Sequence, residues 1–76
     1  METENFYQNL GRCIRSIRKK HGLTQEQLGQ CIGCTKSAIV NYETGIRKIP
    51  FDVLVKMSHH YNISIDHLIK KTENTG

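Results

Sequence analysis

The chain is short and basic, and it has no long apolar run. Its 76 residues give room for one domain, residues 1–76 with an ordered core at about residues 5–70, because so short a chain builds only a small hydrophobic core. Eleven lysines and arginines against seven acids give a formal charge of +4, which favours a polyanionic partner. The acidic first five residues precede no apolar stretch, so neither a signal peptide nor a membrane span is expected. We therefore expect a cytoplasmic protein without a membrane partner.

The periodicity predicts five helices and no strands, which places the chain in the all-α class. The first helix is expected over about residues 5–21, where apolar side chains recur at helical spacing before Gly22 closes the helix. This apolar stripe consists of Phe6, Leu10, Ile14, Ile17 and His21.

Two short helices follow within residues 25–44. Thr24 offers a hydroxyl cap to the first of them, and Thr35 offers one to the second. Gly33 supplies the turn between them, and Gly45 is placed to end the pair in the left-handed conformation. This arrangement predicts a helix-turn-helix, whose second helix enters the major groove of DNA.

The remaining residues predict a fourth and a fifth helix. Pro50 suits the first position of a helix that runs to about Tyr61, and Asn62 can adopt the left-handed conformation that ends it. Ser64 is the expected cap of the fifth helix. The polar residues 70–76 are expected to be frayed.

One face of the third helix carries side chains that suit base edges. Lys36 can donate to guanine and Asn41 can pair with adenine, while Ser37 can donate or accept and Val40 can pack on a thymine methyl. The alternative interpretation is that a short polar stripe is simply a solvated helix face. The spacing of these residues with the predicted turn favours base reading.

The stretch from Leu23 to Gly45 resembles the lambda repressor/Cro class of XRE-type helix-turn-helix regulators. The matching positions are the Leu-Thr-Gln-Glu opening at residues 23–26, Leu28, Gly29, Gly33, Thr35, Ile39, Glu43, Gly45 and the later segment 62–68. The resemblance covers roughly Leu10 to Ile69 and departs from the usual pattern at Cys34, Val40 and His67. It implies a compact five-helix domain, a DNA-binding transcriptional regulator that acts as a repressor, and a homodimer on a palindromic double-stranded operator.

Further residues are candidates for contacts with the DNA backbone. Gln25 stands at a helix start, where free amides attract phosphate, and the resemblance implies that it also braces the recognition helix. The full set of phosphate candidates is Thr24, Gln25, Thr35, Thr44, Arg47 and Lys48. For Arg47 and Lys48 the alternative is that they are ordinary solvated loop residues. For Thr24 and Thr35 a DNA contact would come in addition to their role as helix caps.

Arg18 and Glu43 are expected to form a structural ion pair. Arg18 borders the apolar stripe of the first helix, and Glu43 is an acid on a helix that should approach phosphate. Both placements are explained if Arg18 turns inward and neutralises Glu43, as similar pairs in the family do. The alternative is two independent exposed charges.

The fifth helix supplies the predicted dimer interface. Leu68 suffices to dock this helix on the core, which leaves Ile65 and Ile69, four residues apart, without an obvious use inside the chain. Scattered exposed isoleucines are common, so the alternative is that they have no role.

The cysteines do not predict a metal site. Cys31 and Cys34 have the spacing of half a zinc site, but His59 and His60 are expected on a different helix, and a structural zinc needs four ligands. We expect no metal, no cofactor and reduced thiols, with redox sensing by the two cysteines left open. No nucleophile, base and orienting group converge, so we expect no enzyme.

These features together predict a sequence-specific DNA-binding regulator. Two other interpretations remain open: an antitoxin-like regulator whose main partner is a toxin protein, and a helical adaptor that binds only protein. A regulatory protein partner is compatible with the first of these.

Overall fold

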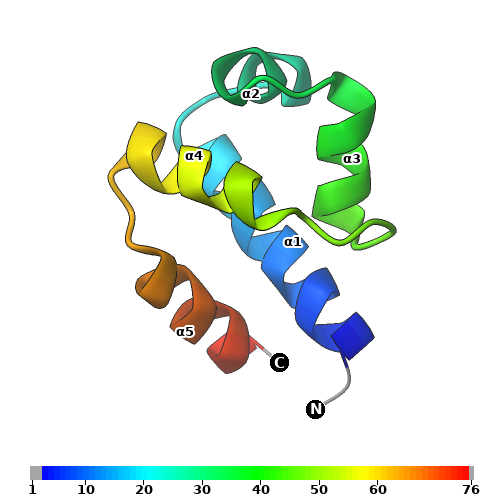
Figure 1. Ribbon diagram of the computed structural model, residues 1–76, viewed down its shortest axis with the longest axis vertical. Helices are drawn as coiled ribbons and strands as arrows, with labels where there is room; N and C mark the ends of the chain where they lie inside the picture. Colours follow the sequence, from blue (N-terminus) through cyan, green and yellow to red (C-terminus); the bar gives the residue numbers. More distant parts are fainter. Residues whose placement is uncertain (1–2, 76) are drawn as a thin grey trace.

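Five helices joined by short loops make up residues 3–75, the part of the chain that the computed structural model describes, with side chains described for residues 6–73 (Figure 1). The helices are α1 (Thr3–Lys20), α2 (Gln25–Ile32), α3 (Lys36–Thr44), α4 (Phe51–Tyr61) and α5 (Ile65–Thr75). No strand occurs among these residues, and the all-α prediction is confirmed. Residues 1–2, which entered the signal-peptide expectation, and Gly76 lie outside the described residues.

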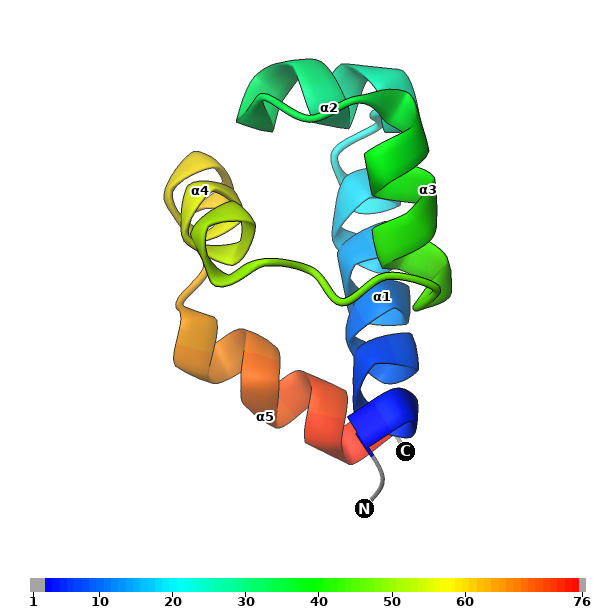
Figure 2. The same ribbon diagram turned by 45° about the vertical axis from the view of Figure 1, so that its right-hand side comes forward.

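Helix α1 packs directly against α3 and α5, whereas α2 packs against α3 and α4. Figures 1 and 2 show α3 along one flank of α1 and α5 along the other, with α4 crossing between α2 and α5. The core consists of Leu10, Cys13, Ile14, Ile17, Leu28, Ile32, Ile39, Ile49, Val53, Leu54, Met57 and Leu68. Each large aliphatic side chain buried in this way contributes roughly 1.5–3 kcal/mol. Of the stripe predicted on the first helix, Leu10, Ile14 and Ile17 lie in this core and Phe6 packs against it, whereas His21 is exposed.

The turn between α2 and α3 is defined by its caps. The Thr24 hydroxyl accepts from the Gln27 amide at 3.1 Å, and the Gln27 side chain accepts from the Thr24 amide at 2.9 Å, which forms a capping box. The Thr35 hydroxyl accepts from an amide in the first turn of α3 at 3.1 Å. Gly33 and Gly45 have φ of 74° and 79°, in the left-handed region where a Cβ is disfavoured. The sequence predicted these helix ends, with Thr24 and Thr35 as the N-terminal caps and Gly33 and Gly45 as the glycines that follow each helix.

The boundaries of α4 follow the expected signals with one shift. Pro50 is extended and precedes the helix, so the first helical residue is Phe51, one position later than predicted. Asn62 ends α4 with φ of 54°. The Ser64 hydroxyl accepts from the His67 amide at 3.0 Å and caps α5 as expected.

The end of α5 differs from the sequence prediction. Residues 70–75 continue the helix instead of fraying. Thr72 is 1% exposed, and its hydroxyl donates to the Leu68 carbonyl at 2.9 Å and lies 3.6 Å from the Cys13 sulfur on α1. The prediction of a frayed end was wrong because a small polar side chain, satisfied by its own helix, docks this turn on α1.

No helix within residues 3–75 is both long and apolar enough to cross a membrane.

Candidate nucleic-acid interface

The outer face of α3 presents the residues that the sequence proposed for base reading. Lys36 and Ser37 are exposed, whereas Val40 and Asn41 are half-buried and still reach the surface. Figure 2 shows α3 at the outer edge of the molecule with α1 behind it. On the opposite face, Ile39 is fully buried in the core. The helix therefore presents polar and small apolar groups outward while its inner face anchors it.

A buried network ties α3 to α1 and α2. Arg18 Nε donates to Glu43 Oε2 at 2.6 Å and Nη2 donates to Oε1 at 3.2 Å, while Nη1 donates to the Leu23 carbonyl at 2.7 Å. The two charged side chains are only 10% and 3% exposed. The Gln25 amide adds a bond to Glu43 Oε1 at 3.2 Å. Because paired donors surround the carboxylate, its charge is compensated on the helix that would approach phosphate.

Gly11 sets how closely α1 approaches α3. A Cβ built at this position would lie 2.4 Å from the Tyr42 carbonyl oxygen and 2.5 Å from that of Glu43. These neighbours are backbone atoms, so they cannot move aside without shifting α3. Sequence reasoning missed this residue, although a glycine inside a predicted helix was the available signal.

The three threonines proposed for phosphate contact differ in what they can donate. Thr24 and Thr35 accept from backbone amides as caps, which leaves each hydroxyl proton free to point outward. The Thr44 hydroxyl instead points back at the carbonyls of Val40 and Asn41, at 2.9 and 3.3 Å. Thr44 would have to give up this bond to donate to a phosphate oxygen.

The loop after α3 carries the remaining candidate cations. Arg47 is exposed, and its backbone amide donates to the Asn41 carbonyl at 3.2 Å. Lys48 is also exposed, with its ammonium 5.6 Å from the centre of the Tyr7 ring. Glu43 is the single acid from residue 27 to residue 50, and it is buried. The surface formed by α3 and this loop is therefore positively charged.

The apolar surface is distributed differently from the sequence expectation. Ile65 and Ile69 on α5 are half-buried and are not among the residues that pack against the core. Two large hydrophobic residues among the described residues are exposed, Ile46 at 76% and Phe51 at 68%. Sequence reasoning did not single out these two residues, because neither belongs to a helical stripe.

The cysteines are spread over different environments. Cys31 is exposed on α2, and Cys34 is half-buried against the core. Within the described residues, no group of three or more His, Cys, Asp or Glu side chains is arranged to hold a metal ion.

Comparison with known proteins decides the family. A family model described as helix-turn-helix matches residues 14–68. The chain belongs to the XRE-type helix-turn-helix family. The family resemblance proposed from Leu23 to Gly45 is thereby confirmed.

Two curated relatives from Bacillus subtilis are named as HTH-type transcriptional regulators. The uncharacterized HTH-type transcriptional regulator YobD of Bacillus subtilis is 39% identical over 61 residues, which are 80% of this chain and 54% of that protein. The HTH-type transcriptional regulator ImmR of the same organism is 34% identical over 65 residues, 86% of this chain and 51% of its own. The chain therefore spans about half the length of these curated relatives.

A solved structure shows the same fold. The crystal structure of the clp gene regulator ClgR from C. glutamicum superposes with a TM-score of 0.83, covering 92% of this chain and 90% of that one. At 18% identity, this likeness concerns the fold alone.

Proposed function

We propose that the chain binds double-stranded DNA sequence-specifically, with α3 in the major groove, and regulates transcription as a repressor in the cytoplasm. The observation that carries this proposal is the exposed face of α3, held by the buried bonds of Arg18 to Glu43. A helix that reads base edges must be held rigidly, because good bidentate contacts depend on the position of the side chain. Occupying the groove over a promoter excludes polymerase, which is why repression is the proposed outcome.

The charges of this surface support DNA over a purely protein partner. Lys36, Arg47 and Lys48 are exposed around α3, and the acid of that helix is buried against Arg18. Such a surface attracts phosphate at any sequence and leaves specificity to the groove-facing side chains. A helical adaptor would instead present an apolar outward stripe on this helix. An antitoxin-like regulator would keep the same DNA face and add a toxin partner elsewhere.

Selection of bound sites from random duplex DNA, followed by anisotropy titration, tests the proposal. We expect Asn41→Ala to weaken binding to the selected operator by about 1–3 kcal/mol and to relax preference mainly at one base position. Gln25→Ala and Arg47→Ala should weaken all sequences similarly, and Arg47→Ala should reduce the salt slope by about one unit. Lys70→Ala, which removes the same charge from α5, is the control and should leave the salt slope nearly unchanged.

Equal losses from Asn41→Ala on the operator and on random DNA would contradict base reading by this residue. A chain for which selection enriches no sequence would contradict sequence-specific binding altogether.

We further propose that the chain binds a palindromic operator as a homodimer through Ile65 and Ile69. One half-site offers few base contacts, so two recognition helices about 34 Å apart would supply the missing affinity. Both isoleucines are half-buried and lie on the helix that flanks α1 opposite α3, outside the packed core.

Sedimentation with and without palindromic DNA tests the interface. Ile65→Lys combined with Ile69→Lys should give a folded monomer that binds a half-site weakly. Ile46→Lys combined with Phe51→Lys is the matched comparison, because these side chains are more exposed. If only the substitutions at Ile46 and Phe51 abolish dimers, the α5 interface is wrong. If the natural chain stays monomeric at micromolar concentration on palindromic DNA, the proposal of dimerisation is wrong.

A further inference from the structure

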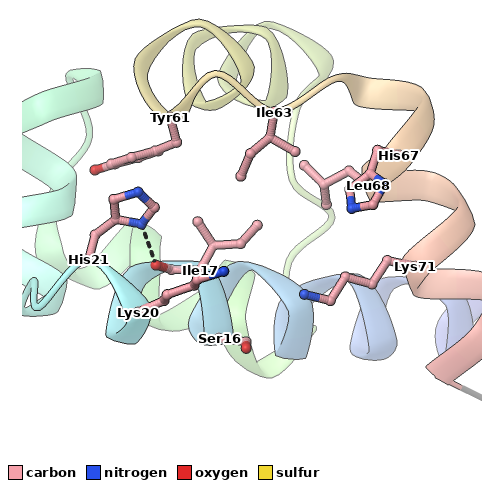
Figure 3. A pocket seen from close by; sticks show the side chains of 9 residues that line it. All are labelled: Ser16, Ile17, Lys20, His21, Tyr61, Ile63, His67, Leu68 and Lys71. Atoms are coloured by element: carbon pink, nitrogen blue, oxygen red, sulfur yellow. Dashed lines mark hydrogen bonds between the residues drawn. The ribbon is translucent and has the colours of Figure 1, made fainter.

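A pocket of about 300 Å³ opens between α1, the end of α4 and the start of α5 (Figure 3). Ile17 of α1 lies below it, Ile63 of the α4–α5 loop lies above it, and Leu68 of α5 closes one side. These apolar side chains belong to the core or pack against it, so the pocket is a hollow in the side of the core. Its size lies at the lower end of the range found for sites that bind small organic molecules.

Two rings form the far wall of this pocket. The centres of the His21 and Tyr61 rings are 4.5 Å apart, and the rings are tilted by 52°. The Nδ1 of His21 donates to the Ile17 carbonyl at 2.9 Å, which holds the imidazole in place. An aromatic or branched apolar group entering the pocket would meet this wall on one side and the aliphatic floor on the other.

The mouth of the pocket is cationic. Lys20 and Lys71 both line it, and in Figure 3 their side chains extend toward one another along α1. None of the described residues that line the pocket is an aspartate or a glutamate. A carboxylate at the mouth would be attracted by the ammonium group of the exposed Lys20. The lining therefore combines an apolar interior with positive charge at the opening.

From this lining we infer that the pocket binds a small organic anion with an apolar body, such as an aromatic carboxylate. The residues that line the pocket come from α1, the end of α4 and the start of α5, and Figure 1 shows α3 on the other side of α1 from α5, so an occupant would leave the proposed DNA face clear. The inference does not depend on the proposed function, because binding can be measured on the protein alone.

Titration of the ¹⁵N-labelled chain, followed by amide chemical shifts, tests this inference with three probes. Indole-3-acetate should produce saturable shifts confined to the amides around Ile17, His21, Ile63 and Leu68, with a Kd on the order of 1 mM or tighter for a ligand of this size. Tryptamine, with the same ring system and a positive charge, should not bind. Acetate, with the charge and no ring, should give no saturable shifts below about 10 mM, a range roughly tenfold above that Kd.

Charge reversal at the mouth separates a specific site from general attraction. Lys20→Glu should weaken indole-3-acetate binding at least tenfold. Lys19→Glu is the matched control, because the neighbouring exposed lysine does not line the pocket and the net charge changes equally. Unchanged shift dispersion of both variants shows that they are folded.

Equal weakening by the two substitutions would overturn the site, because net charge alone would then explain the attraction. Equal binding of tryptamine would overturn the assignment to anions. The absence of localised shifts with indole-3-acetate up to about 10 mM, tenfold above the expected Kd, would overturn the inference as a whole.

Discussion

The two flanks of α1 are held in different ways. Toward α3, the contact is a backbone approach at Gly11 and a set of directional bonds from Arg18. Toward α4 and α5, the contacts are mainly apolar, a pocket remains, and the buried Tyr61 hydroxyl makes no hydrogen bond of good geometry among the described residues. Directional bonds fix the orientation of a helix, whereas apolar contacts are non-directional and tolerate a hollow. The flank that carries the proposed recognition helix is therefore the more tightly specified.

The largest effect is expected from separating Arg18 and Glu43. Arg18→Ala or Glu43→Ala alone should lower the free energy of unfolding by about 3–5 kcal/mol, because each leaves a buried charge without its partner. Removing both should lower it by less than the two single losses added together. Urea unfolding of the four proteins in a double-mutant cycle measures this coupling.

The exposed pair of Lys70 and Asp66 provides the control for this cycle. Its atoms are 3.3 Å apart, with side chains 70% and 78% exposed. Solvent screens such a pair, so its coupling should not exceed about 0.5 kcal/mol. A coupling equally small for Arg18 and Glu43 would remove the distinction between the two flanks.

A methyl group at Gly11 should give the next largest effect. Gly11→Ala should destabilise the protein by about 2–3 kcal/mol, although alanine favours helix by about 1 kcal/mol, because the added carbon meets backbone of α3. Thermal unfolding gives the stability, and the anisotropy assay shows whether α3 is displaced. Gly22→Ala adds the same group where nothing lies within 4 Å, at φ of 70°. This control should cost only the left-handed strain, roughly 1–2 kcal/mol, and an equal loss at both glycines would exclude a special contact at Gly11.

The parts of the fold that sequence could predict are those with local causes. Thr24, Gly33 and Thr35 act on amides and dihedrals within a few residues, so the helix ends near them could be read directly. The expected pairing of Arg18 with Glu43 came from the family resemblance and from the conflict of an acid on a helix that faces phosphate. The structure places those two side chains in contact.

What the sequence could not show depends on where separate helices meet. In the sequence alone, Gly11 is only a residue with low helix propensity inside a predicted helix. Its role follows from the close approach of the α3 backbone at this position. Thr72 lies in a polar run, and only the position of α1 makes it a buried contact. The pocket likewise requires α1, α4 and α5 together, so no single segment signals it.

Tyr61→Phe should give the smallest effect and probes the more loosely filled flank. The hydroxyl is buried and makes no hydrogen bond of good geometry among the described residues, although it interacts with the Cys31 thiol, a weak acceptor. Its removal should therefore raise the free energy of unfolding by up to about 1 kcal/mol at neutral pH. Burial raises the pKa of Tyr61, and the nearby Cys31 thiol adds to the rise. The unfolded chain therefore releases this proton near pH 10, while the folded protein retains it to higher pH. Titration of Tyr61 leaves the free energy of unfolding unchanged below about pH 10 and lowers it as the pH rises above that value. Urea unfolding at pH 7 and at pH 10.5 should show a smaller decline in stability for Tyr61→Phe than for the natural chain, since all other titrating groups are shared.

A loss of more than about 1 kcal/mol at pH 7 on Tyr61→Phe substitution would instead mean that the hydroxyl is well bonded, and the contrast between the two flanks would then rest on the pocket alone.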